Sequence, residues 1–266
     1  MATLCFNGFN RSGWFGVDPE LEAQIAGAAR AGFTLFGPDV YSVAPQAEAG
    51  PTAAEVAGLL AQHGMRCYEI AALMVGSDAA DAQLQATAIA ELAAVLHPEW
   101  ILTNVVEPPD DDLVASLVRC ADVIGETGAR LAIEYLPWTP VAGARAALDV
   151  AARAGHDRVK VLLDSWHHFR GPDTWADLDA VPLEEIAYLQ FDDALPMVAD
   201  DVLAETLARR VFPGEGEFDL DGWCEHIRAK GFDGVVSVEV LNDELRDLDP
   251  AEFAQRAFDA ASRYWK

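Results

Sequence analysis

The chain has 266 residues, of which 52% are hydrophobic, so it is long and apolar enough to bury a large core. Asp and Glu number 44 against 18 Lys and Arg, which gives a formal net charge of −26. Such an excess of acid repels phosphate backbones and anionic lipid surfaces, so neither nucleic acid nor a membrane is an expected partner.

The four cysteines, Cys5, Cys67, Cys120 and Cys224, are scattered and form no C-x-x-C pair. This usage is typical of reduced, mostly buried thiols in a cytosolic protein. The first ten residues lack a basic stretch followed by an apolar run, so no signal peptide is expected. No run of about 18 apolar residues occurs, so no membrane-spanning helix is expected either. Together these features predict a cytoplasmic location.

Short runs rich in β-branched and aromatic residues alternate with Ala-rich amphipathic stretches along the whole chain. The expected strands are residues 4–9, 33–40, 66–73, 100–107, 130–138, 159–167, 186–194 and 234–242. The stretches between them have apolar residues at helical spacing, and most end at a glycine that suits a helix C-terminus. The sixth expected helix, around residues 173–181, has the weakest pattern, and the last begins at Pro250.

Eight strand–helix alternations without a long polar linker favour a parallel α/β architecture. In a chain of this length they predict a (β/α)8 TIM barrel, with residues 1–266 forming a single domain. No G-x-G-x-x-G motif follows the first expected strand, which weighs against an open dinucleotide-binding sheet. The connection 194–213 is long and acidic, so it is a candidate lid or partner-contacting segment.

Four consecutive expected strands each end in an acid or an amide, namely Glu134, Asp164, Gln190 and Glu239. Side chains alternate along a strand, so if Ile133 points towards the helices, all four residues point into the barrel. The carboxyl ends of barrel strands form the active-site rim. Each residue alone could be a solvated strand end, but the joint pattern at matching depth favours a functional site.

These four residues form an oxygen-rich ligand set. Carboxylate and amide oxygens suit Mg²⁺ or Mn²⁺, and the same ligands serve both ions. Three crowded carboxylates would repel one another without a cation. We therefore expect Glu134, Asp164, Gln190 and Glu239 to bind one divalent metal ion, Mn or Mg.

Further candidates follow the same strands. Arg210, just before a P-G-E-G turn, is the best candidate to hold a substrate carboxylate or phosphate, and Arg66 is a second. Asp193, or its neighbour Asp192, would orient ligands or bind substrate. The alternative for each arginine is a surface salt bridge.

Aromatic and imidazole side chains also fall near the expected rim. Trp14 and Trp138 are candidates to wall the pocket with flat apolar surface, although they could instead pack beneath loops. His167 and His168 follow Asp164 directly and are candidates for proton transfer or substrate binding, with a plain surface position as the alternative.

The residues that surround these candidates resemble a known group of enzymes. The segments LAIEYLP, VLLDSWHH, YLQFDDA and RRVFPGEGEFDLDGWCEHIRAKGFDGVVSVEV resemble the sugar phosphate isomerase/epimerase superfamily, the xylose isomerase-like TIM barrels. In relatives that epimerise ketoses, the metal ligands are Glu, Asp, His and Glu. Here Gln190 stands where those relatives have histidine, and this pattern is similar to that of bacterial 3-dehydroshikimate dehydratases.

The resemblance implies an enzyme that acts on a small-molecule substrate and removes a proton next to a metal-polarised carbonyl. The leading hypothesis is an isomerase or epimerase of a sugar or related polyol ketone, with Glu134 and Glu239 as base and acid on opposite faces. The alternative is a lyase of a cyclic hydroxy-ketone such as 3-dehydroshikimate, in which His167 or His168 protonates the leaving hydroxyl.

Two other readings of the same barrel are less well supported. A nuclease similar to endonuclease IV would need more than these six histidines and a basic surface. A catalytically inactive binding barrel would not need all four metal ligands. Barrels of this kind often pair, so a homodimer is a further expectation.

Overall fold

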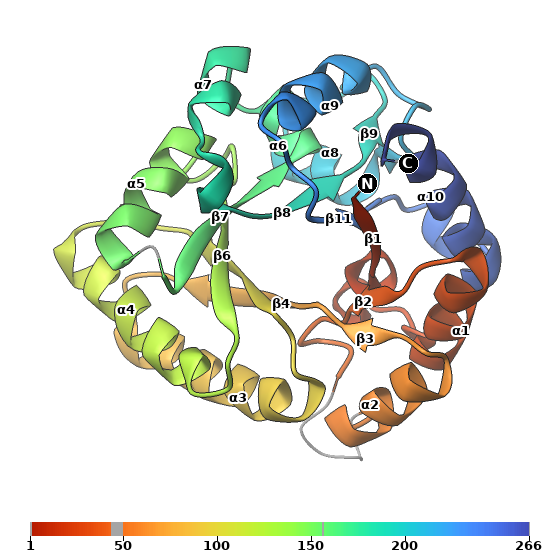
Figure 1. Cartoon of the computed structure of the whole chain (residues 1–266), viewed down its shortest axis with the longest axis horizontal. Helices are drawn as coiled ribbons and strands as arrows, with labels where there is room; N and C mark the ends of the chain where they lie inside the picture. The colour runs from red at the N-terminus through yellow and green to blue at the C-terminus, as the bar shows by residue number, and fades with distance from the viewer. Residues whose placement is uncertain (1, 44–49, 156, 266) are drawn as a thin grey trace.

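A computed structural model describes residues 2–43, 50–155 and 157–265, and it shows a barrel of parallel strands enclosed by helices (Figure 1). Nine strands form the barrel sheet in the order β3-β2-β1-β11-β8-β7-β6-β5-β4. The expected (β/α)8 barrel is therefore confirmed. The strands are β1 (Thr3–Asn7), β2 (Leu35–Gly37), β3 (Arg66–Cys67), β4 (Glu69–Val75), β5 (Trp100–Val105), β6 (Arg130–Glu134), β7 (Val159–Asp164), β8 (Ile186–Phe191) and β11 (Val235–Val238).

The barrel closes where β3 meets β4, because the single residue Tyr68 joins these two ends of the sheet. The amide of Tyr68 donates to the carbonyl of Phe36 at 3.0 Å, and its own carbonyl accepts from the amide of Trp100 at 3.1 Å. The strand expected at 66–73 is thus split into β3, which pairs with β2, and β4, which pairs with β5. Together its halves occupy one of the eight barrel positions.

Helices surround the strands. They are α1 (Leu21–Ala31), α2 (Ala53–Gln62), α3 (Ala79–Leu96), α4 (Asp111–Gly125), α5 (Ala144–Ala154), α6 (Ser165–Arg170), α7 (Trp175–Ala180), α8 (Val202–Ala208), α9 (Leu220–Ala229) and α10 (Pro250–Trp265). Most begin at a capping side chain; Thr52 and Glu55, for example, form a capping box on α2. The first and last helices pack together, and a Cβ on Gly27 would lie 2.8 Å from the Cα of Ala251. This close approach requires glycine in α1.

The expected sixth helix exists as the short α7, preceded by an unpredicted helix, α6, that starts directly after β7. The connection after β8 also has its own structure. Its ends pair as the antiparallel strands β9 (Asp193–Ala194) and β10 (Arg210–Val211), and α8 lies between them. Four short 3-10 turns complete the described elements: Gly8–Arg11, Gly13–Phe15, Leu183–Glu185 and Leu245–Asp247.

Two apolar cores hold the barrel. The larger lies between strands and helices, and the smaller fills the barrel interior. Ala132, Leu162 and Tyr188 belong to the interior core, which agrees with the expected alternation of side chains. All four cysteines are buried and unpaired, as expected. Within the part of the chain that the structure describes, no helix is long and apolar enough to cross a bilayer.

Candidate active site

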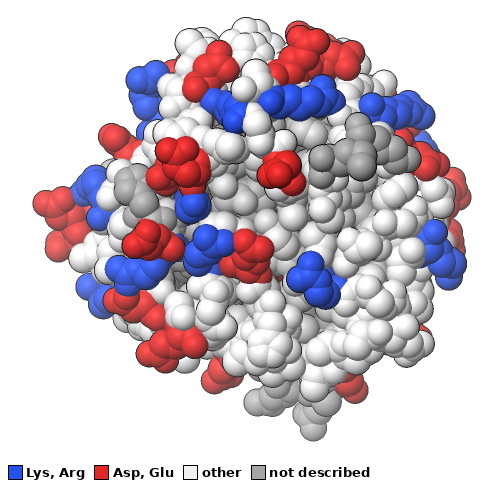
Figure 2. Space-filling view, viewed as in Figure 1, with Lys and Arg blue, Asp and Glu red and all other residues white. Residues whose placement is uncertain are grey.

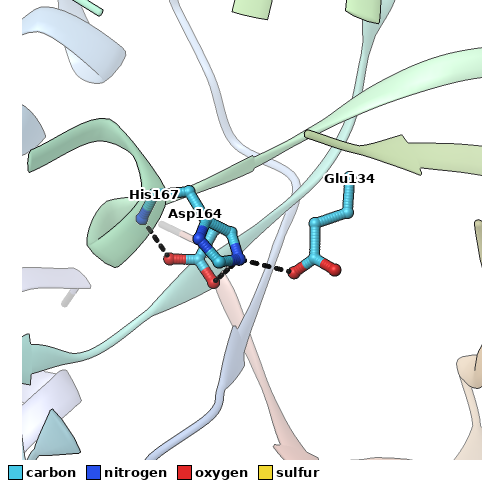
Figure 3. A group of neighbouring side chains, drawn as sticks. All are labelled: Glu134, Asp164 and His167. Atoms are coloured by element: carbon cyan, nitrogen blue, oxygen red, sulfur yellow. Dashed lines mark hydrogen bonds and ion pairs between the residues drawn. The ribbon is translucent and has the colours of Figure 1, made fainter. Parts of the chain in front are cut away.

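Glu134 and Asp164 are the last residues of the neighbouring strands β6 and β7, and both are buried. His167, in the first turn of α6, lies between them in Figure 3. Its Nε2 is 3.3 Å from Oε1 of Glu134 and 3.7 Å from Oδ2 of Asp164. Ligand atoms of all three residues lie within 4.8 Å of one another, close enough to hold one metal ion.

Asp164 has two roles because its two oxygens have different partners. Oδ1 accepts from the amides of Trp166 at 2.6 Å and His167 at 3.2 Å, which caps α6. Oδ2 instead accepts from Nη1 of Arg210 at 3.0 Å. Burial favours the protonated acid, but Arg210 and His167 outweigh it and hold the pKa of Asp164 below its usual value. The cap thus fixes the start of α6, and with it the position of His167.

Gln190 and Glu239 form the other side of the cluster. Nε2 of Gln190 donates to Oε1 of Glu239 at 3.1 Å, and Oε1 of Gln190 is buried without a hydrogen-bond partner. The register pairs Gln190 with Asp164 and Ser237, which carries it to the same depth as the carboxylates. A buried carbonyl oxygen without a donor costs free energy unless an ion or a water satisfies it.

Arg210 lies at the centre of the acids. Its Nη1 is 3.0 Å from Asp164, 2.6 Å from Asp192 and 3.2 Å from Glu239. Burial alone would lower the pKa of Arg210, but the surrounding carboxylates raise it, so it stays a cation. Burial, and then repulsion from Glu134 and Asp164, raises the pKa of Glu239 well above the usual value despite Arg210.

A cavity of about 190 Å³ opens above this cluster. Its polar lining includes Asn104, Glu134, His167, Arg210 and Glu239. The rest of the wall is mostly apolar and includes both expected tryptophans together with Phe9, Tyr41, Met74 and Leu207. Trp14 and Trp138 are 47% and 38% exposed, respectively, so they stand at the mouth of the cavity.

Three residues expected to bind the substrate lie outside the cavity wall. Arg66 is exposed at the start of β3, whereas the site lies at the far ends of the strands. His168 is buried against Trp175 of α7, with ring centroids 5.0 Å apart, and it does not line the cavity. Burial, with His226 nearby, lowers the pKa of His168 to about 4. Consecutive helical residues point about 100° apart, so His167 can face the cavity only if His168 does not.

Asp193 is the third correction. Its carboxylate accepts from the backbone amides of Gly214, Gly216 and Phe218 at 3.0–3.1 Å. It therefore holds the P-G-E-G turn and does not face the cavity. Its neighbour Asp192 turns the other way, towards Arg210, and orients that side chain instead.

Two side-chain amides next to Glu134 and Glu239 were not among the site residues predicted from the sequence. Asn104 Nδ2 donates to Oε2 of Glu134 at 2.8 Å, and Asn7 Nδ2 donates to Oε1 of Glu239 at 3.0 Å. Asn104 comes from the end of β5 and Asn7 from the end of β1. The alternation that predicted Glu134 could have identified both, because each is a polar residue at the end of a barrel strand.

The donors fit a divalent metal ion. Carboxylate oxygens of Glu134 and Asp164 and one imidazole nitrogen of His167 lie together. Glu239 adjoins this group through Arg210, and Gln190, whose amide oxygen is unsatisfied, is hydrogen-bonded to Glu239. Oxygen donors suit Mg²⁺ or Mn²⁺, while the imidazole extends the set towards softer ions. Part of the charge compensation already comes from Arg210, which contacts two of these carboxylates.

Comparisons with known proteins agree with this architecture. A family model described as the xylose isomerase-like TIM barrel matches residues 25–263. The IOLI protein, solved with a bound zinc atom, superposes over 99% of both chains with a TM-score of 0.83 and 20% identity. L-Ribulose 3-epimerase superposes over 100% of this chain and 95% of its own, with a TM-score of 0.74 and 18% identity.

Curated relatives match over shorter stretches. The 3-dehydroshikimate dehydratase of Pseudomonas putida is 33% identical over 135 residues, which are 50% of this chain and 21% of that protein. The inosose isomerase of Halalkalibacterium halodurans is 26% identical over 145 residues, 54% of this chain and 50% of the relative. The matches thus span about half the length of the isomerase and about a fifth of the dehydratase.

Proposed function

The chain belongs to the xylose isomerase-like TIM barrel family, and on this basis we propose that it is a metal-dependent isomerase or epimerase of a sugar or related polyol ketone. The observation that carries the proposal is the pair of glutamates in the cavity wall. Glu134 ends β6 and Glu239 follows β11, and two other strands separate β6 from β11 in the barrel. Carboxylates placed apart in this way can reach opposite faces of one carbon.

Each glutamate is prepared for proton transfer by its own surroundings. Glu239 is held by Asn7 and Gln190, which orient its carboxyl group as the acid. Glu134 has one oxygen fixed by Asn104 and the other directed at His167, which orients it as the base. His167 Nε2 can in turn donate to a substrate oxygen that lies between these acids.

Glu134, Asp164, Gln190 and Glu239 would hold the metal, which we propose to be Mn²⁺ or Mg²⁺. When bound, such an ion polarises a carbonyl and stabilises negative charge on its oxygen. The chain's residues fix the orientation of the ligands: Asn7 and Gln190 hold Glu239, Asn104 holds Glu134, and backbone amides hold Asp164.

A dehydratase is the second candidate, favoured by two observations. Gln190 stands in the metal site, and the dehydratase relatives show the higher local identity. In that reaction Glu134 would remove the proton, and His167 would protonate the leaving β-hydroxyl, which departs as water. Both proposals share the first step, so the product distinguishes them.

The test is exchange of solvent deuterium into ketoses, inososes and 3-dehydroshikimate by the Mn²⁺-loaded protein, followed by mass spectrometry. We expect metal-dependent exchange and an isomer with one of these ketones. Glu134→Gln and Glu239→Gln should each reduce exchange by at least about 100-fold, since each removes a proton-transfer group. Glu215→Gln, an exposed glutamate of the P-G-E-G turn, is the matched control.

No exchange with any of these ketones would contradict the proposal. Loss of water with formation of a conjugated product would establish the dehydratase instead. Circular dichroism of each variant separates a lost activity from a lost fold.

A further inference from the structure

We propose that the cavity selects an uncharged hydroxy-ketone, one that carries neither a phosphate nor a carboxylate. This inference rests on the proposed function for its location, and it concerns the charge of the substrate that the same site accepts. It differs from the expectation that Arg210 would hold an anionic group of the substrate.

The first argument is that all three guanidinium nitrogens of Arg210 already have partners within the protein. Arg210 is the one Lys or Arg among the described residues that line the cavity. Its Nη1 is already shared by Asp164, Asp192 and Glu239 at 2.6–3.2 Å. A carboxylate or phosphate is bound best by two parallel N–H groups, and these contacts occupy one arm of that fork.

The other arm is held by α8. Nε of Arg210 donates to Oγ1 of Thr206 at 3.1 Å, and Nη2 donates to the same oxygen at 2.8 Å. The guanidinium is thus fixed along its length by the protein. An anionic substrate would have to displace a buried carboxylate from it, which leaves that carboxylate without its partner.

Arginines elsewhere near the rim are also engaged. Arg170 pairs with Glu217 at 2.7 Å, Arg209 pairs with Glu205 at 3.0 Å, and Arg246 pairs with Asp243 at 2.8 Å. Residues 44–49, which follow the loop after β2, contain no Lys or Arg in their sequence. The described rim therefore offers no unpaired cation that could replace Arg210 as an anion ligand.

The local charge also opposes an anion. Four acidic groups, those of Glu134, Asp164, Asp192 and Glu239, outnumber the single guanidinium of Arg210 at the site. In a buried site, where charges are weakly screened, this excess repels a second anion.

The remaining wall suits an uncharged ring. Phe9, Trp14 and Tyr41 lie on segments after β1 and β2, and Trp138 lies after β6. Flat apolar surfaces of this kind bind the C–H face of a polyol, while its hydroxyls reach the carboxylates below. The cavity has a volume of about 190 Å³, which suits a small molecule.

The test is binding of matched pairs to the Mg²⁺-loaded protein, measured by saturation-transfer NMR titration. The pairs are D-fructose with D-fructose 6-phosphate, and methyl shikimate with shikimate. We expect the uncharged member of each pair to bind at least tenfold more tightly. Equal or tighter binding of the charged members, or no saturation transfer to either uncharged member, would overturn the proposal.

A variant that adds a positive charge tests whether the charge of the cavity wall causes this preference. Leu207→Lys places a cation in the cavity wall, whereas Leu84→Lys makes the same change on α3 at a side chain that is 71% exposed. We expect the preference for the uncharged member to fall at least threefold in Leu207→Lys and to stay unchanged in Leu84→Lys. Equal preferences in both variants would show that charge in the wall does not select the substrate.

Deuterium exchange separates this inference from the proposed function. Preferred binding of the uncharged ligands without exchange into D-fructose or any other ketone would support the selectivity and reject the isomerase. Exchange confined to phosphorylated or carboxylated ketones would support proton abstraction and reject the selectivity.

Discussion

Asn104 and Asn7 fix the two glutamates that flank the cavity, each through one amide hydrogen bond of 2.8–3.0 Å. A ligand whose second oxygen is held in place loses less freedom when it binds an ion. Partners of this kind are typically worth about 10–100-fold in metal affinity. The amides therefore act through the glutamates that they orient.

For Asn104→Ala we expect Mn²⁺ affinity to fall by about 10–100-fold with the fold preserved, because Glu134 loses its amide donor. Calorimetric titration of the metal-free protein measures the change. Thr103→Val is the control, since Thr103 neighbours Asn104 on β5 and its hydroxyl bonds only the carbonyl of Ile101. Equal losses in both variants would point to a general disturbance of β5.

Glu69 is a buried acid inside the barrel that the proposed chemistry does not use. Its Oε1 accepts from the hydroxyl of Ser237, and burial raises its pKa to about 7. An acid with a raised pKa stabilises the fold when it is protonated. Its contribution is therefore complete below about pH 4.5 and is lost as the pH rises through 7.

Glu69→Gln should remove this loss of stability at high pH. We expect the variant to match the wild type in free energy of unfolding near pH 4.5 and to exceed it by on the order of 3 kcal/mol at pH 8, in metal-free protein. Urea unfolding at both pH values measures the difference. A variant that is less stable than the wild type at pH 8 would show that Glu69 is bound there as a carboxylate.

For single residues, the alternation of side chains along strands predicted which acids face inward, because this alternation depends only on the pleat of the strand. It could not predict what each inward residue contacts. Asp192 and Asp193 are neighbours, and only the fold shows that one binds Arg210 and the other binds the turn at Gly214. Arg66 begins β3 and so lies at the end of the barrel opposite the site, which the alternation of side chains does not reveal.

Among the elements, the turn at residues 213–218 depends on one side chain. Asp193 accepts three backbone amides from it, and hydrogen bonds to a charged group are worth about 1.5–3 kcal/mol each. The adjoining pair β9–β10 positions Arg210, so the turn also supports the site from outside.

Asp193→Ala should lower the free energy of unfolding by about 3 kcal/mol or more, since it leaves several amides without an acceptor. Asp201→Ala, which removes an exposed helix cap from α8, should cost only about 1 kcal/mol. Urea denaturation of both variants gives the comparison. Equal costs would mean that water replaces the carboxylate at the turn.

The regular strands and helices were predictable because their periodic patterns are strong. The interruption at Tyr68 was not, since residues 66–73 form one continuous pattern and only barrel closure divides it. The helix α6 was also missed. It is six residues long and begins at Ser165, with Asp164 as its cap. The site carboxylate and the helix cap therefore coincide in a segment whose sequence is typical of the end of a strand.

For the whole molecule, the net charge of −26 acts against compactness. Figure 2 shows positive and negative side chains interspersed over one face, so local pairing offsets part of this repulsion there. The remaining repulsion is between exposed charges and is screened by salt, with a Debye length of about 10 Å at 0.1 M.

We therefore expect the melting temperature to rise by a few degrees when NaCl is raised from about 0.02 M to about 0.5 M. Differential scanning calorimetry measures the shift, and sucrose at matched osmolality is the control for effects other than screening. A melting temperature that falls with salt would mean that the surface ion pairs outweigh the repulsion.

Different halves of the chain supply different groups to the cavity. The proposed proton-transfer and ligand groups lie at the ends of β6, β7, β8 and β11, whereas Phe9, Trp14 and Tyr41 follow β1 and β2. The groups proposed to react with the substrate thus come mainly from the second half of the sequence. Part of the apolar wall that contacts the substrate comes from short loops of the first half. Descendants of this chain could acquire new substrates through changes in residues 8–16 and 38–43 alone, while the inherited proton-transfer machinery stays intact.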